Sequence, residues 1–141
     1  MSASIERTAS LDSIEEFKAF LKSEAVAGGV PELEMGRVTL ALEEVLTSIV
    51  YHAYPKADGR INPRHTIQLA CKAKDGQLLM RIVDKGKPFN ALADAGSGLD
   101  LLGGGGGMGI YLVRKIMDKV QYERIGDFNV LRLLYTSKAA R

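Results

Sequence analysis

The dipeptide Asp75-Gly76 constrains the fold most, because it lies between two segments that both have the pattern of a β-strand. Residues 65–74 alternate between apolar and polar side chains, and residues 77–84 are dense in apolar ones. An Asp-Gly pair between two such segments is a strong short-range signal for a hairpin. The sequence therefore predicts two antiparallel strands joined by a tight turn.

The other elements are predicted by apolar periodicity and by the Gly, Pro and Asp residues that interrupt it. We expect helices over 12–26, 32–54 and 109–118, and strands over 4–9, 65–74, 77–84, 119–125 and 128–136. The elements are grouped rather than alternating, which predicts an α+β fold. We expect a two-layer sandwich, with helices on one face of a mixed, mostly antiparallel sheet.

Length and charge exclude several classes of protein. The 141 residues predict a single domain spanning 1–141. Nineteen Lys and Arg against 17 Asp and Glu leave a net charge of +2, too small for a strongly basic nucleic-acid-binding protein. One cysteine, Cys71, excludes a disulfide framework and a multi-cysteine metal site. No leader and no apolar run of about 20 residues is visible, so we expect a cytoplasmic protein without a membrane partner.

Two polar residues of the second predicted helix, Glu44 and Ser48, border its apolar stripe. They are four residues apart and therefore adjacent on one helix face. A carboxylate at such an edge can gain proton affinity from partial burial, which suits a general base, but an ordinary exposed glutamate is the alternative. His52 lies beside the same stripe. With only one other histidine in the chain, it favours a packed side chain over a metal ligand.

Asp84 and Gly86 follow one another closely where the strand over 77–84 ends. An Asp at the end of an apolar strand can point inward and accept a hydrogen bond from a ligand amine. A glycine has no Cβ and lets a flat ring approach the backbone. The alternative is a simple turn, because Asp, Gly and Pro88 are all turn formers.

Six of the 15 glycines occupy the seven positions from Gly103 to Gly109, directly before a predicted helix. Free backbone N–H groups at a helix N-terminus suit phosphate. The segment lacks the Gly-Lys-Ser/Thr of a Walker loop, and no strand-turn-helix unit precedes it as in a dinucleotide fingerprint. A flexible linker is the alternative, although linkers rarely run straight into a well-patterned helix.

Together, the three segments resemble in order and spacing the Bergerat (GHKL, histidine-kinase-like) ATPase fold of gyrase, MutL and histidine kinases. They are most similar to its small stand-alone branch, the anti-sigma-factor serine/threonine kinases of the RsbW and SpoIIAB type. Residues 41–54 resemble the N-box, 84–89 the G1 box and 107–122 the G2 box with its following helix, and Asn129 matches the late strand. The resemblance covers essentially the whole chain.

The resemblance implies a serine kinase that uses ATP and Mg²⁺. Glu44 would activate the attacking hydroxyl of a protein serine, and Asp84 would accept from the adenine amino group, with Gly86 beneath the ring. The other nucleotide-binding residues that it implies are Ser48, His52, Gly105, Gly107, Met108 and Gly109, with Ser48 also as the metal ligand.

Partners are implied by the same resemblance. The substrate would be a STAS-type anti-sigma-factor antagonist, and a sigma factor or similar regulator would be sequestered. Direct nucleic-acid binding is not implied. Family members commonly form homodimers through the sheet or the first strand, for which residues 4–9 are the candidate here.

Two departures from the family pattern leave other functions open. The N-box of the family has Asn where this chain has Ser48, whose hydroxyl is a shorter and weaker magnesium ligand. No Lys or Arg lies between Pro88 and Met108, although phosphoryl transfer relies on cations, so Lys85, Lys87 or an arginine from a partner would have to supply them.

The main alternative is therefore a nucleotide-responsive binding module with weak or no kinase activity. A detached catalytic domain of a two-component histidine kinase is a second alternative. It is disfavoured because no dimerising helix pair or phospho-accepting histidine segment precedes residue 30. A protein that binds no nucleotide is a third.

Overall fold

The computed structural model describes residues 2–54, 62–93 and 107–140, with only the helical backbone at 107 and 108. The elements follow in the order β1 (Ala3–Thr8), α1 (Ile14–Ala27), α2 (Met35–His52), β2 (Thr66–Lys74), β3 (Gln77–Asp84), α4 (Gly107–Ile116), β4 (Lys119–Ile125) and β5 (Phe128–Thr136). Short 3₁₀ turns lie at Leu11–Ser13, Glu32–Glu34 and Lys138–Ala140.

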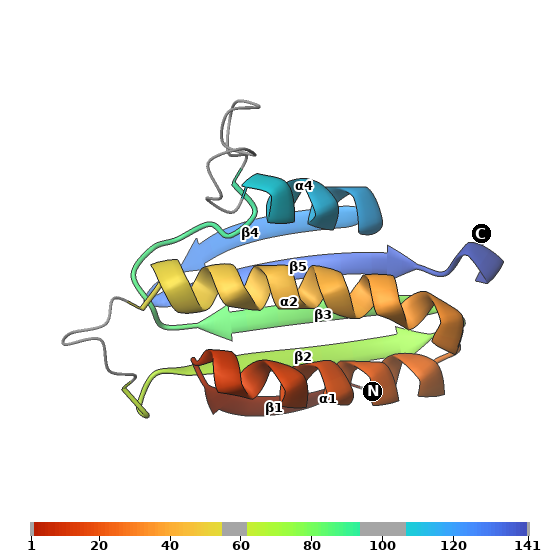
Figure 1. Ribbon diagram of the computed structural model, residues 1–141, viewed down its shortest axis with the longest axis horizontal. Coiled ribbons are helices and arrows are strands. Elements are labelled where there is room, and N and C mark those ends of the chain that lie inside the picture. The colour runs from red at the N-terminus through yellow and green to blue at the C-terminus, as the bar shows by residue number, and fades with distance from the viewer. Residues whose placement is uncertain (1, 55–61, 94–106, 141) are drawn as a thin grey trace.

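The strands form one five-stranded sheet in the order β1-β2-β3-β5-β4. Helices α1, α2 and α4 all lie on one face of it, so the molecule has two layers (Figure 1). The predicted α+β class and the single helical face are confirmed. All four pairings between the described strands are antiparallel, so the parallel pair expected of a mixed sheet is absent among them. Since β5 lies beside β3, the end of β3 meets the start of β5.

The predicted hairpin around Asp75-Gly76 is confirmed. Asp75 has φ 53° and Gly76 has φ 80°, the left-handed conformation at both central positions that a type I′ turn needs. The turn is anchored on both sides, because the Gly76 N–H donates to the Gly28 carbonyl at 3.0 Å and its carbonyl accepts from Ser137 N–H at 2.8 Å. The second hairpin joins β4 to β5 and has its left-handed residue at Gly126, with φ 57°.

The helix boundaries differ from the predicted ones at their ends. The first two helices begin two or three residues later than expected, because 3₁₀ turns occupy Leu11–Ser13 and Glu32–Glu34. The last helix runs over 107–116 instead of 109–118. It ends early because the Asp118 N–H donates to the Leu134 carbonyl at 2.8 Å, which commits the chain to the sheet.

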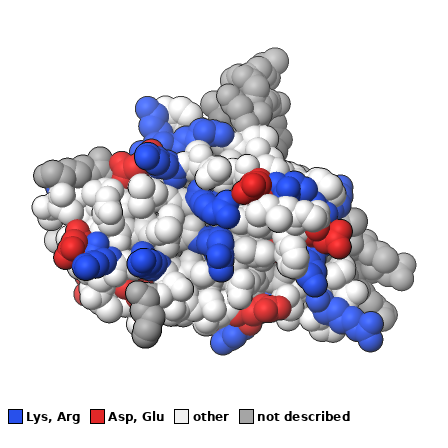
Figure 2. Space-filling view, turned by 180° about the vertical axis from the view of Figure 1, so that it is seen from behind, with Lys and Arg blue, Asp and Glu red and all other residues white. Residues whose placement is uncertain are grey.

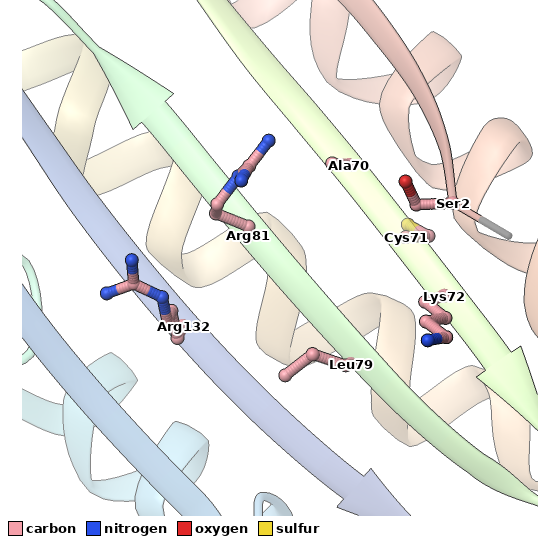
Figure 3. A pocket seen from close by; sticks show the side chains of 7 residues that line it. All are labelled: Ser2, Ala70, Cys71, Lys72, Leu79, Arg81 and Arg132. Carbon is pink, nitrogen blue, oxygen red and sulfur yellow. The ribbon is translucent and has the colours of Figure 1, made fainter.

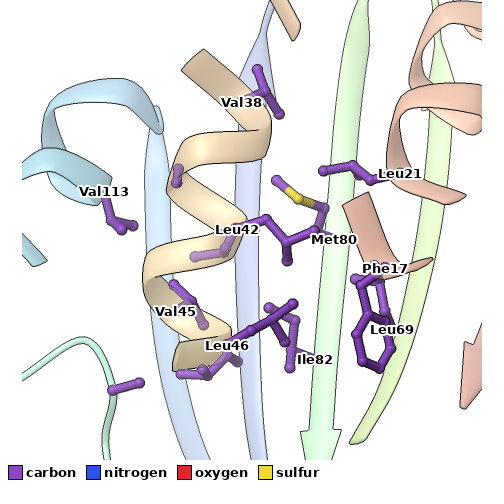
Figure 4. Close-up of a cluster of buried hydrophobic side chains, with 14 of the residues drawn as sticks. Phe17, Leu21, Val38, Leu42, Val45, Leu46, Leu69, Met80, Ile82 and Val113 are labelled. Carbon is purple, nitrogen blue, oxygen red and sulfur yellow. The ribbon is translucent and has the colours of Figure 1, made fainter. Parts of the chain in front are cut away.

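The core lies between the helices and the inner face of the sheet (Figure 4). The apolar stripe predicted on the second helix is buried throughout, with exposed fractions of 0–2% at Met35, Val38, Leu42, Val45, Ile49 and Ala53. Burying each leucine-sized side chain contributes about 1.5–3 kcal/mol. Helix α2 is therefore held firmly over the middle of the sheet, and side chains at the edge of its stripe have fixed positions. None of the described helices is long and apolar enough to cross a membrane.

Candidate functional site

Asp84 is the last residue of β3 and is buried, with 3% of its surface exposed. It lies opposite Asn129, which is 45 residues away in sequence. Its Oδ1 accepts hydrogen bonds from Asn129 Nδ2 at 2.9 Å and from the Gly86 N–H at 2.8 Å. Burial raises the pKa of Asp84, whereas these two hydrogen bonds and the charge of Arg124 act in the opposite direction. The result is a buried carboxylate held in one orientation.

Asn129 is the centre of the hydrogen bonds around this carboxylate. Its Oδ1 accepts from Tyr122 Oη at 2.6 Å, from Arg124 Nη1 at 3.2 Å and from the Phe89 N–H at 3.2 Å. Its amide nitrogen donates to the Lys87 carbonyl at 2.9 Å as well as to Asp84. Asn129 is 1% exposed, so this network fixes the side chain with every polar group paired.

Tyr122 and Arg124 were not among the residues expected from the sequence. Both lie on β4, two positions apart, and so project to the same face of the sheet. Arg124 is the register partner of Asn129, and its Nη1 also donates to the Gly86 carbonyl at 2.9 Å. The alternation of residues along β4 could have indicated that Tyr122 and Arg124 face inward. The residue that they contact, Asn129, depends on β5 being the neighbouring strand.

The packing gives Gly86 a reason to be glycine that the sequence did not indicate. A Cβ at Gly86 would lie 2.5 Å from the Ala53 carbonyl oxygen and 2.7 Å from the Ala53 Cβ. The Lys87 N–H donates to the same Ala53 carbonyl at 2.9 Å. The missing side chain thus makes room for the C-terminal end of α2.

Gly86→Ala should therefore destabilise the fold by about 1–3 kcal/mol, because a methyl group would overlap backbone atoms that cannot move independently. Urea denaturation followed by circular dichroism measures the change. Gly36→Ala is the matched control, since a Cβ there meets no atom within 4 Å and alanine favours the helix. Equal stability of Gly86→Ala and the wild-type chain would contradict the close approach of Ala53.

Aromatic side chains at the same C-terminal end of α2 also hold the turn after β3. Tyr54 Oη donates to the Thr66 carbonyl at 3.0 Å and accepts from the Lys85 N–H at 2.9 Å, and burial raises its pKa to about 12. His52 is exposed, and its ring centroid lies 5.1 Å from that of Phe89. His52 is thus next to the segment after β3, on its solvent side.

Glu44 lies in the middle of α2, half-buried, against the first turn of α4. A Cβ at Gly109 would be 2.4 Å from Glu44 Oε2, so the carboxylate rests on the backbone of that glycine. The start of a helix carries unpaired N–H groups and partial positive charge. Two segments that the sequence suggested separately, α2 and the end of the glycine run, therefore meet here.

The other expected residues of this region are placed as follows. Ser48 is half-buried on α2, one helical turn after Glu44. Gly107 and Met108 form the first backbone positions of α4. Gly105 lies outside the described residues. Within residues 2–54, 62–93 and 107–140, no three His, Cys, Asp or Glu side chains cluster as a metal site.

Helix α2 connects these two groups of residues. Its middle carries Glu44 beside Gly109, and its end at Ala53 touches Gly86 next to Asp84. Ala53 lies nine residues after Glu44, a distance of about 13 Å at the helical rise. The arrangement offers a buried acceptor at one end and a carboxylate beside a helix N-terminus at the other.

Comparison with known proteins gives three findings. The family model of the histidine kinase-like ATPase domain matches residues 8–135. The RsbU and RsbW domains of Rv1364c from Mycobacterium tuberculosis superpose with a TM-score of 0.65 at 14% identity, over 96% of this chain and 32% of that one. The histidine kinase domain of the blue-light activated histidine kinase from Erythrobacter litoralis superposes with a TM-score of 0.55 at 16% identity, over 94% of this chain and 63% of that one.

At these identities the two structures show the common fold. The chain spans about a third of the first structure and less than two thirds of the second. No curated protein sequence matches it.

Proposed function

Because the chain belongs to the histidine kinase-like ATPase domain family, we propose that it binds ATP along α2 and phosphorylates a serine of a regulatory partner protein. The observation that carries this proposal is the contact between Glu44 of α2 and Gly109 of α4. The C-terminal end of α2 also packs against Gly86, two residues after Asp84. A proton acceptor can take the proton of a hydroxyl, a helix N-terminus suits phosphate, and a buried hydrogen-bond acceptor can bind an adenine amine.

Asp84 is proposed to recognise the adenine base. Its Oδ1 is already engaged by Asn129 and Gly86, which leaves the second oxygen as the acceptor for a ligand amine. Adenine presents an amino group, whereas an oxo group at the same position of the purine would place an acceptor against an acceptor. A buried acceptor left unpaired is costly, so this arrangement favours adenine over guanine.

The phosphates are proposed to lie near the start of α4, because the first N–H groups of a helix, here those of Gly107, Met108 and Gly109, have no partner within the helix. Ser48 is the residue of α2 on this side that would hold Mg²⁺. Magnesium commonly takes one or two protein oxygens, with water and phosphate as its other ligands, so no cluster of carboxylates is needed. The ion would neutralise part of the charge that develops on the phosphates.

Glu44 is proposed to accept the proton of the serine hydroxyl as its oxygen bonds to the γ-phosphorus and the bond to the β-phosphate oxygen breaks. The base must be within hydrogen-bond reach of that hydroxyl, and the packing on Gly109 fixes its position. This is where the chain itself contributes to the reaction, beyond binding and orienting the nucleotide.

The partners are proposed from the RsbW-like fold. We propose a STAS-type anti-sigma-factor antagonist as the substrate and a sigma factor or similar regulator as the protein that is held. A homodimer is proposed through β1, because among the described strands β1 pairs with β2 alone and its outer edge is unpaired.

Magnesium binding by Ser48 can be tested directly. Isothermal titration of ATP should give an affinity at least about tenfold higher with Mg²⁺ than without it. Ser48→Asn should raise that magnesium dependence and the rate of phosphoryl transfer severalfold, because the amide oxygen reaches further. Thr47→Asn is the matched control on the neighbouring, also half-buried position and should change neither.

The same titration separates the proposed kinase from a nucleotide-responsive binding module, which the serine in the N-box favours. ATP binding that is independent of Mg²⁺, together with no phosphorylation of a purified STAS-type antagonist from a neighbouring gene, would support the binding module. Magnesium-dependent binding with serine phosphorylation would support the kinase.

The affinity for ATP should depend on pH through Asp84. Its ionised form is the better acceptor, so affinity should increase as the pH rises through its pKa. Asn129→Ala removes a hydrogen bond that lowers this pKa, and the increase should therefore move to higher pH. The loss of a buried partner should also cost about 1–3 kcal/mol of stability.

Titrations of the protein with ATP at several acidic pH values measure this shift in the pH dependence of affinity. The ionisation of ATP itself affects all variants equally and therefore cancels when they are compared. Tyr122→Phe is the matched control, because it removes one bond to Asn129 Oδ1 and leaves both amide donors in place. Identical pH profiles for Asn129→Ala and Tyr122→Phe would refute the role of Asn129 in holding the carboxylate.

A further inference from the structure

The face of the sheet opposite the helices carries a basic row that the proposed function does not use. Met80 and Ile82 face the helices and are fully buried, so Arg81 between them projects from the open face. Its register partner on β5 is Arg132. Figure 2 looks onto this face, and Lys and Arg side chains gather near its middle.

Two like charges directly opposite each other on neighbouring strands are unfavourable. Arg132 is compensated by Glu123 at 3.1 Å, an ion pair that remains partly exposed. Arg81 forms no salt bridge with any residue that the structure describes. The row therefore holds a cation for which the described part of the chain supplies no counter-charge.

The surface around this row is hollowed. A cavity of about 180 Å³ is lined by Ser2, Ala70, Cys71, Lys72, Leu79, Arg81 and Arg132, as Figure 3 shows. A second hollow of about 510 Å³ continues toward the Asp75-Gly76 turn and shares Lys72 and Leu79 with the first. Leu79 is 44% exposed, although it belongs to β3, which pairs with a neighbouring strand on both sides. The groove thus combines an apolar floor with positive walls.

The charges on this face are unequal in a chain whose net charge is only +2. By strand alternation it carries the cations Lys72, Lys74, Arg81, Lys119 and Arg132 and the carboxylates Glu6 and Glu123. Glu123 pairs with Arg132, whereas Glu6 accepts from the Thr66 hydroxyl at 2.5 Å and keeps its charge. Asp75 also lines the second hollow. Five cations against three carboxylates leave this face with a net positive charge.

We propose that this groove, defined by Lys72, Leu79, Arg81 and Arg132, binds an acidic amphipathic segment of another protein. Carboxylates of the segment would pair with Arg81 and Arg132, and its apolar side chains would cover Leu79. The apolar floor favours a peptide over a nucleic-acid backbone, which would leave Leu79 uncovered. A second copy of this chain, related by a two-fold axis through this row, would place its arginines against the same arginines of the first copy. The repulsion between these like charges disfavours a second copy as the occupant.

A defined peptide tests the proposal. A capped peptide in which Glu alternates with Leu should bind the full chain and shift the amide resonances of β2, β3 and β5 rather than those of the helices. A peptide with Lys in place of Glu should not bind, and one with Ser in place of Leu should bind at least about tenfold more weakly. Absence of shifts on these three strands would overturn the proposal.

Charge reversal provides the matched variants. Arg81→Glu and Arg132→Glu should each weaken peptide binding at least about tenfold, and higher salt should weaken it in the wild-type chain. Lys22→Glu, an exposed reversal on α1, should leave it unchanged. Arg81→Glu creates an opposite-charge pair with Arg132, so its thermal stability should not fall; Arg81→Gln is the milder variant should it fold poorly.

Three further outcomes would overturn the proposal. If Arg81→Glu and Lys22→Glu bound the peptide with equal affinity, the basic row would not be part of the binding site. A DNA duplex that binds the same strands more tightly than the peptide would assign the face to nucleic acid. If the wild-type chain sedimented as a homodimer and Arg81→Glu as a monomer, this face would be assigned to a second copy of the chain. ATP titration of Arg81→Glu keeps this test separate from the proposed function, since the groove lies on the face opposite α2 and affinity for ATP should be unchanged.

Discussion

Asp84→Asn should lower the affinity for ATP by more than about 100-fold and leave the fold intact, because a charged acceptor in a buried site is replaced by an amide that also presents a donor. The hydrogen bonds from Asn129 and Gly86 both end on Oδ1, which asparagine retains. The substitution therefore changes the one oxygen proposed to face adenine. Isothermal titration measures the loss of affinity.

The stability of the same variant has a defined pH dependence. Burial raises the folded pKa of Asp84 above its ordinary value of 3.8, so the folded chain binds this proton more tightly than the unfolded one. The free energy of unfolding of the wild-type chain should therefore fall, relative to Asp84→Asn, as the pH rises from below 3.8 through the raised pKa. Denaturation at several pH values measures the difference.

Asp75→Asn is the matched control for both measurements. Asp75 lies in the exposed hairpin turn at φ 53°, a conformation that asparagine also adopts readily. The substitution should therefore affect neither the affinity for ATP nor the stability of the fold. ATP binding by Asp84→Asn at the wild-type affinity would show that the base is recognised elsewhere.

Glu44→Gln should reduce the rate of phosphoryl transfer by about 10²–10⁴-fold, the usual contribution of a positioned base. Glutamine has the same shape and keeps the contact with Gly109, so the affinity for ATP should change by less than about threefold. Single-turnover phosphorylation of the serine substrate measures the rate, and titration of ATP measures the affinity.

Glu43→Gln is the control for this change. Glu43 is the next residue of α2, but its carboxylate accepts from Lys18 Nζ at 2.9 Å on the side of α1, away from α4. It should leave the rate unchanged. An undiminished rate in Glu44→Gln would mean that another group accepts the proton, whereas no transfer by the wild-type chain would favour the binding module.

Most of the fold could be predicted from local patterns. Both hairpins, the five strands and the three described helices follow from alternation, helical periodicity and the Asp-Gly and Gly-Asp turns. The errors are at helix ends, where partners outside the helix decide: Asp118 leaves the last helix because it bonds to Leu134, a residue of β5. Local sequence carries no information about that partner.

The sequence by itself determined which side chains could act, and the tertiary structure decided which of them meet. Asp84 and Glu44 stand out locally, at a strand end and at the edge of an apolar stripe. The pairing of β3 with β5 brings Asn129 to Asp84, and the pairing of β5 with β4 adds Arg124.

The packing of α4 on α2 sets Gly109 against Glu44, and the end of α2 gives Gly86 its reason to be glycine. Contacts between residues so far apart depend on strand order and helix packing. These are set by how the whole chain buries its apolar surface, which no single segment encodes.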